Sequence, residues 1–169
     1  MKGKYRASGQ FRILFALAFL SQPILICSQQ MPDFGPDGLA GLTLEQREKL
    51  SRGKIIMPES VVKTPKGKTL IEAALVFDRP PEKVWEILSK TEDQVKYLDN
   101  IKDATVISRG PTENTIEFKV KILVKTFIYR QIHNFDKTNL YFYWTLDPDF
   151  RGDLKELNGF WRFYPFGSG

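Results

Sequence analysis

One stretch in the second half of the chain constrains the fold more than any other, because large apolar residues there alternate with charged ones. Ile, Phe, Val, Ile and Val occupy every second position from 116 to 124, and Glu117, Lys119 and Lys121 lie between them. Successive side chains of a β-strand point to opposite faces of its sheet, so the pattern predicts a half-buried strand. We therefore expect residues 116–124 to form a strand.

More strands are predicted around this one, together with two short helices. Alternating apolar residues mark strands over residues 69–78, 104–108, 127–135, 140–146 and 157–163. Turn-forming residues mark turns at 109–114 and 136–139. After the first strand, Pro80-Pro81 begins one helix, and Thr91 begins another through a capping box with Gln94. This order predicts an α+β fold with a curved antiparallel β-sheet.

The first 28 residues have the layout of a secretory signal peptide. A basic segment ending at Arg12 precedes an apolar run over residues 13–26, and Ser28 provides a small residue at the cleavage position. An uncleaved membrane anchor and a lipidated Cys27 are the two alternatives. We expect an exported protein, periplasmic or secreted, with a signal peptide over 1–28, a linker over 29–42, a helix and arm over 43–68, and the folded domain over 69–169. The helix of the third segment begins at a capping box of Thr43 with Gln46.

The distribution of charge argues against nucleic-acid binding. The whole chain has a formal net charge of +5, but the four charged residues that precede Asp33 are all basic, so the chain from Gln29 onward carries only +1. A nearly neutral domain lacks the basic surface that binding to phosphates requires. Because the one cysteine, Cys27, lies within the predicted signal peptide, the folded domain depends on packing rather than on a disulfide.

The order of motifs resembles the START-like (SRPBCC) superfamily, which includes polyketide cyclases/dehydrases and coenzyme Q-binding proteins. The segment 77–88 is similar to the family's first strand running into a helix with the pattern Pro-x-x-Val-Trp, here Pro81 to Trp85. Trp144-x-Leu146 and the later Gly-Phe-Trp at 159–161 are similar to the family's paired strands. The resemblance implies a helix-grip fold closed by a long C-terminal helix. Since the sequence ends at residue 169, we expect a C-terminally truncated domain in which the closing helix is missing.

The same resemblance implies an apolar cavity between the sheet and a helix. The large aromatic residues of the predicted strands fit a cavity lining and an ordinary core equally well, and it is the resemblance that favours the cavity. We expect the bound ligand to be a lipid, an isoprenoid or a quinone-like molecule, held by burial of its apolar surface. The predicted lining residues are Trp85, Phe118, Tyr129, Phe142, Trp144 and Trp161.

Catalysis is the weaker alternative. His133, the one histidine, has no nucleophile or paired carboxylate close in sequence, and Arg151 stands where a calcium loop over 147–153 would need an oxygen ligand. We therefore predict no catalytic residue, metal or other cofactor. A polyketide cyclase or aromatase would use the same cavity, with His133, Tyr129 or Arg130 assisting proton transfer. A protein-interaction module is a third alternative, and the fold would also allow self-association through an open sheet edge and contact with a membrane surface.

Overall fold

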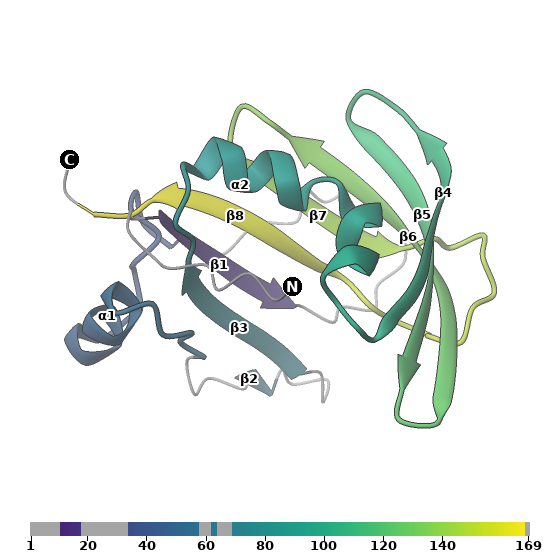
Figure 1. Ribbon diagram of the computed structural model, residues 1–169, viewed down its shortest axis with the longest axis horizontal. Coiled ribbons are helices and arrows are strands. Elements are labelled where there is room, and N and C mark those ends of the chain that lie inside the picture. The colour runs from purple at the N-terminus through teal and green to yellow at the C-terminus, as the bar shows by residue number, and fades with distance from the viewer. Residues whose placement is uncertain (1–10, 18–33, 58–61, 64–68, 168–169) are drawn as a thin grey trace.

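A computed structural model describes residues 11–17, 34–57, 62–63 and 69–167 of the protein. Its sheet has the strand order β2-β3-β1-β8-β7-β6-β5-β4, and all neighbouring strands are antiparallel (Figure 1). The strands are β1 (Phe11–Leu17), β2 (Val62–Lys63), β3 (Thr69–Val76), β4 (Ile101–Arg109), β5 (Glu113–Ile122), β6 (Lys125–Asp136), β7 (Tyr141–Leu146) and β8 (Gly159–Pro165). The helices are α1 (Leu44–Ser51), α2 (Pro81–Leu88) and the 3-10 helix η1 (Thr91–Lys96). The predicted α+β class with an antiparallel sheet is confirmed.

Local sequence signals explain where two of the helices begin. The Thr43 hydroxyl accepts a hydrogen bond from the Gln46 backbone N–H at 3.2 Å, and the Gln46 side chain accepts one from the Thr43 N–H at 2.9 Å. This capping box starts α1 as predicted. Helix α2 starts at Pro81, whose missing N–H costs nothing at a first helical position.

The third helix differs from its prediction. Thr91 makes no capping bond and lies within a 3-10 helix, with Lys90 in the cap position. Its side chain is completely buried, so the hydroxyl is turned into the protein instead of toward the backbone N–H groups that a capping box would satisfy. The predicted capping box at Thr91 is therefore wrong, although a short helix does follow α2.

The strand predicted over 116–124 also ends earlier than predicted. Strand β5 stops at Ile122, and Leu123 and Val124 form the turn to β6. The apolar side chains at this end of the pattern are not buried, since Ile122 is 54% exposed and Val124 is 97% exposed. The hairpin extends past its neighbouring strands at this end, so there is no layer for these side chains to pack against.

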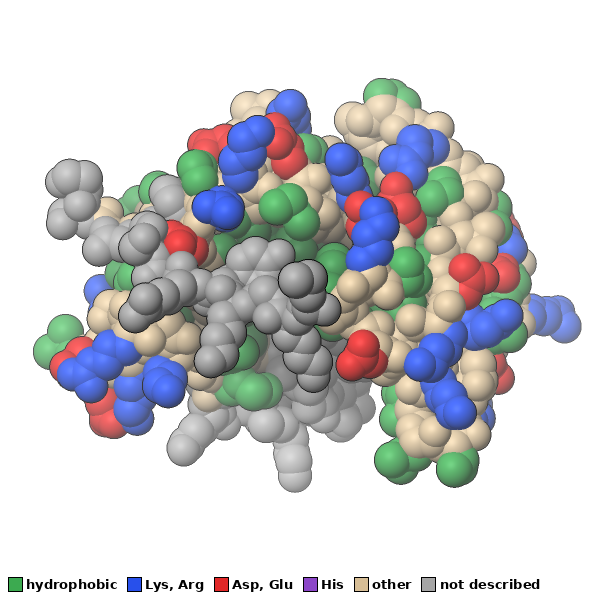
Figure 2. Space-filling view, in the orientation of Figure 1, with side chains coloured by type: hydrophobic (Ala, Val, Ile, Leu, Met, Phe, Trp, Pro, Cys, Tyr) green, Lys and Arg blue, Asp and Glu red, His purple; other side chains and the backbone are tan. Residues whose placement is uncertain are grey.

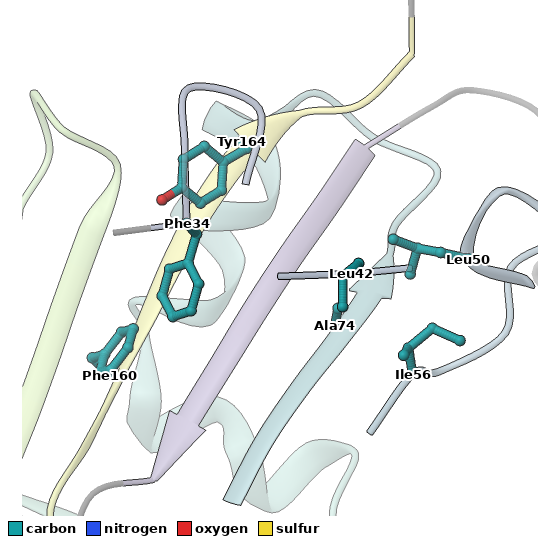
Figure 3. Packing of buried hydrophobic residues seen from close by; sticks show 7 residues of the cluster. All are labelled: Phe34, Leu42, Leu50, Ile56, Ala74, Phe160 and Tyr164. Atoms are coloured by element: carbon teal, nitrogen blue, oxygen red, sulfur yellow. The ribbon is translucent and has the colours of Figure 1, made fainter. Parts of the chain in front are cut away.

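One face of the sheet is covered by residues 34–57, which lie between β1 and β2 in the chain. Figure 3 shows the cluster of Phe34, Leu42, Leu50, Ile56, Ala74, Phe160 and Tyr164. Ile56 and Ala74 exchange two backbone hydrogen bonds of 2.8 and 2.7 Å, which hold the arm against β3. Gly38 is needed for close approach, since a Cβ atom there would lie 2.5 Å from the Tyr164 ring. Residues 34–42, part of the predicted linker, thus contribute Phe34 and Leu42 to the core.

The opposite face is covered by α2. Val84 of this helix packs with Phe142, Trp144 and Phe163 of strands β7 and β8. Because side chains alternate along β8, Phe160 joins the first cluster and Phe163 joins this one. The strands near the centre of the sheet are therefore covered on both sides. Among the described residues, no helix is both long and apolar enough to cross a membrane.

Strand β1 occupies the place between β3 and β8. It pairs with each of them over six register positions, from Arg12↔Val76 to Leu17↔Ile71 on one side and from Phe11↔Pro165 to Ala16↔Phe160 on the other. These residues lie inside the predicted signal peptide, and the rest of residues 1–28 lies outside the described part of the chain. The export prediction and the linker residues 29–33 are therefore not tested by the structure.

A substitution at Phe142 tests whether the side chains beneath α2 form a packed core. Its side chain is 0% exposed, so replacing Phe142 with Ala should lower the free energy of unfolding by about 3–5 kcal/mol. Leu44→Ala is a matched control because Leu44 is 86% exposed, and we expect a change within about 0.5 kcal/mol. Urea denaturation measures both, and similar small effects of the two substitutions would contradict the assigned packing.

Candidate functional site: an aromatic layer around His133

The candidate site lies on the face of the sheet that α2 covers. Alternation along the strands brings a continuous set of ring-bearing side chains to this face, since residues two apart in a strand point the same way. Val84 and Trp85 of α2 pack against these side chains. The ring-bearing members are Trp85, Phe118, Tyr129, His133, Phe135, Phe142, Trp144, Trp161 and Phe163.

His133 lies in the middle of this layer. Its ring centroid is 6.1 Å from that of Phe118, 6.2 Å from that of Phe135, 6.5 Å from that of Phe142 and 5.9 Å from that of Trp144. The Phe118 ring in turn stacks on Tyr129 at 5.6 Å. His133 therefore connects the cluster beneath α2 with the cluster of β4, β5 and β6 that contains Phe118.

Burial keeps the His133 ring neutral. The residue is 1% exposed, and loss of solvation lowers the pKa of its imidazole to about 3. Its Nε2 lies 3.1 Å from the amide oxygen of Gln131, the next residue on the same strand face. With that oxygen as the acceptor, the ring proton is assigned to Nε2, which leaves the lone pair on Nδ1.

Three buried polar atoms along this layer find no hydrogen-bond partner among the described residues. They are Nδ1 of His133, Oδ1 of Asn114 and Nε1 of Trp85. Asn114 is the register partner of His133 on β5, and the Trp85 indole meets the Phe135 ring edge-on at 6.5 Å. Each buried polar atom without a hydrogen-bond partner lowers the stability of the fold by about 1–3 kcal/mol. Packing alone therefore does not explain why this layer holds three of them.

All six residues predicted to line a cavity lie on this face. Trp85, Phe142, Trp144 and Trp161 belong to the cluster beneath α2, and Phe118 and Tyr129 belong to the adjoining one. Phe118 and Phe142 are completely buried, whereas Trp85, Tyr129 and Trp161 keep part of their surface accessible. The structure thus brings the six together, and their role as ligand contacts stays a prediction.

Several members of the layer were not among the predicted lining residues. Phe135, Gln131 and Asn114 share the face because they have the parity of Tyr129 and Phe118 on β6 and β5. Parity along each strand was visible in the sequence and could have identified Phe135 and Gln131. Asn114 could not be identified in this way, because the sequence assigned it to a turn. Only the pairing of β5 with β6 places it beside His133.

Glycine at position 159 has a structural reason. A Cβ atom there would lie 2.5 Å from the Trp144 ring, on the neighbouring strand β7. The Trp144 indole thus occupies the space that a side chain at 159 would fill, and it stacks on His133 at 5.9 Å with an interplanar angle of 28°. This contact accounts for the glycine opposite Trp144 on β8.

Arg130 lies on the opposite face of β6 and takes no part in the layer. One of its guanidinium nitrogens donates to Glu117 at 2.9 Å, another lies 3.6 Å from Asp147, and the group stacks on Phe150 at 4.3 Å. Of the three residues named for a cyclase, only His133 and Tyr129 share a face. Burial raises the pKa of Tyr129 to about 12, which makes its phenol a poor proton donor at neutral pH.

The acidic loop 147–153 serves a structural purpose. The Asp153 carboxylate accepts a hydrogen bond from the Ile128 N–H at 2.7 Å, and the Asp153 N–H donates to the Ile128 carbonyl at 2.8 Å. Asp147 accepts from the Asp149 N–H at 2.9 Å. Within the described segments, no group of three or more His, Cys, Asp or Glu side chains is arranged to hold a metal ion.

Comparison with known proteins yields two solved structures of similar fold. The Thermus thermophilus protein TTHA0849 has a TM-score of 0.43 and 16% sequence identity, over 53% of this chain and 68% of that protein. The Zhui aromatase/cyclase from a Streptomyces species has a TM-score of 0.40 and 10% identity, over 53% of this chain and 63% of the enzyme. Both are similarities of fold alone. No protein-family model and no curated protein matches the sequence.

The buried imidazole makes stability depend on pH. Between about pH 3 and 6.5 the unfolded chain binds more protons than the folded one, so the free energy of unfolding falls by about 1.4 kcal/mol per pH unit as the pH drops. From about pH 7.5 to about pH 5, wild type should lose about 2 kcal/mol more than His133→Phe. Urea denaturation at both pH values measures this difference, which is specific because the chain has a single histidine. Equal losses would show that His133 is solvated.

Proposed function

We propose that the chain is a START-like helix-grip domain that binds a hydrophobic small molecule at the aromatic layer around His133. The observation that carries this proposal is the set of three buried polar atoms without a hydrogen-bond partner among the described residues, within a layer built mainly of aromatic side chains. Binding sites for small molecules combine apolar walls with a few placed polar groups in this way. The motif order of the sequence supports the family assignment.

The three atoms favour a ligand with one oxygen-bearing end. His133 Nδ1 and Asn114 Oδ1 are acceptors, and Trp85 Nε1 is a donor. A hydroxyl group could donate to one of the acceptors and accept from the indole, while the rest of the ligand lies against aromatic rings. A quinol, a phenol or an isoprenoid alcohol has this combination of an apolar body and a small polar end.

Binding fits the electrostatics of the layer better than proton transfer does. An imidazole with a pKa of about 3 is a weak base at neutral pH, and a phenol with a pKa of about 12 is a weak acid. General acid–base catalysis works best with a pKa near the working pH. Both side chains are therefore better suited to hydrogen bonding with a ligand than to carrying a proton in a cyclisation.

Titration with a naphthol or a fluorescent fatty alcohol, whose hydroxyl group can both donate and accept, tests the site. We expect saturable binding by wild type and a roughly tenfold weaker affinity for Trp85→Ala, because a lost aromatic contact and its burial are worth about 1–2 kcal/mol. Tyr97→Ala is the matched control, since Tyr97 is an exposed aromatic residue outside the layer. Tryptophan quenching and probe fluorescence report the affinity.

A second variant separates hydrogen bonding from apolar packing. His133→Phe keeps a ring in the layer and removes the Nδ1 acceptor, so it should weaken a hydroxylated probe several-fold and leave a pure hydrocarbon probe unchanged. If neither Trp85→Ala nor His133→Phe changes the affinity of any probe, the ligand does not bind at this layer. If wild type shows no saturable binding, the proposal fails as a whole.

Export is a further part of the proposal, supported by the basic and apolar layout of residues 1–28. Cleavage near Ser28 would remove β1 and leave the facing edges of β3 and β8 without this partner. N-terminal sequencing of protein from the cell envelope should therefore begin near Gln29. A cytoplasmic product that begins at Met1 would contradict export and keep β1 in the sheet.

A further inference from the structure

The end of the β5–β6 hairpin carries three consecutive apolar side chains that contribute to no core. Ile122 is 54% exposed, and Leu123 and Val124 are the most exposed large apolar residues of the described chain, at 90% and 97%. Figure 2 shows hydrophobic side chains at the lower end of this hairpin, with Lys and Arg side chains beside them. We call Ile122, Leu123 and Val124 the hairpin tip.

The hairpin tip extends beyond its neighbours on a supported base. On the side of β4, the last contact with the hairpin is at Lys121, whose N–H donates to the Asn100 carbonyl at 2.8 Å. On the other side, the last support is the pair of hydrogen bonds between Asp153 and Ile128. Between Lys121 and Ile128 the two strands pair only with each other, so the side chains of the hairpin tip face the surroundings at the end of a two-stranded ribbon.

Neither core packing nor turn chemistry explains the residues of the tip. Leu123 has a φ of 54°, a conformation for which two-residue hairpin turns favour glycine or asparagine. A leucine in that place adds backbone strain and exposes apolar surface without contributing to the core. Its presence is accounted for if the apolar tip is buried against something outside the chain.

The charge around the tip indicates what that is. No acidic residue occurs between Glu117 and Asp136, whereas Lys119, Lys121 and Lys125 lie within this stretch and are exposed. Among the described residues, no carboxylate forms an ion pair with these three lysines. Lys125 Nζ lies 4.6 Å from the centroid of the Phe127 ring, so its ammonium group lies at the base of the apolar tip.

We propose that the hairpin tip inserts into the surface of an anionic lipid bilayer. An apolar tip with lysines directly behind it matches the order of the bilayer interface, where acyl chains lie beneath negatively charged headgroups. The apolar side chains enter the boundary between headgroups and acyl chains, and the lysines pair with the headgroups. This contact is independent of the aromatic layer, and it would bring the ligand-binding domain to a surface that contains hydrophobic molecules.

Vesicle binding by the full-length protein tests the proposal. Wild type should bind phosphatidylcholine vesicles containing about one-third phosphatidylglycerol at least about tenfold more tightly than phosphatidylcholine alone. The double variant Leu123→Ser/Val124→Ser should lose about tenfold or more on the anionic vesicles. Lys121→Glu/Lys125→Glu should lose as much and become less sensitive to salt. Leu44→Ser is the control, because Leu44 is similarly exposed but lies on α1.

A local probe distinguishes the tip from the apolar N-terminal segment, which is present in all of these variants. In a Cys27→Ser background, an environment-sensitive dye on Leu123→Cys should brighten with anionic vesicles, and the same dye on Leu44→Cys should not. Unchanged binding by the double serine variant, or a silent dye at 123, would overturn the proposal. So would concentration-dependent dimerisation that the serine variant abolishes while vesicle binding stays the same, because the partner of the tip would then be a second copy.

Discussion

The contacts of Phe142 hold the rest of the structure in place. This completely buried ring lies 5.6–6.5 Å from the rings of His133, Phe135, Trp144 and Phe163, and it packs with Val84 of α2. Three strands and a helix therefore meet at one side chain. Packing of this density fixes the rotamers of its neighbours, so the position of His133 follows from the same contacts that stabilise the fold.

The layer has a fully buried part, called the floor below, and a partly exposed part, called the rim. Phe118, His133 and Phe142 are fully buried, while Trp85 and Trp161 keep part of their rings accessible. A polar group that the floor presents toward such a rim acts in a low dielectric, where a hydrogen bond to an incoming group is strong and an unmade one is costly. In the proposed site, the same burial that keeps His133 neutral would therefore favour a ligand that can hydrogen-bond to it.

The sequence predicted those parts of the fold that depend on local chemistry. Proline at 81 and the capping box at Thr43 marked the start of two helices, and period-two alternation placed the five predicted lining residues of the strands on one face. It could not show the pairing of Asn114 with His133, since register is set between strands. The alternation that ends at Val124 was misleading because burial ends where the neighbouring strands do. Residues 11–17 have two interpretations, since the sequence assigns them to a signal peptide and the structure pairs them as β1 between β3 and β8.

The place of β1 has a consequence for how the chain folds as it is made. The first strand to leave the ribosome lies between β3 and β8, so the middle of the sheet is completed only after β8 has been synthesised. Contacts between such distant segments form slowly, because a long loop must close before they are gained. During that time β1 lacks its β8 partner. If residues 1–28 are the export signal that we propose, export and pairing in the sheet would compete for the same residues, and the rate of translation would then influence which of the two occurs.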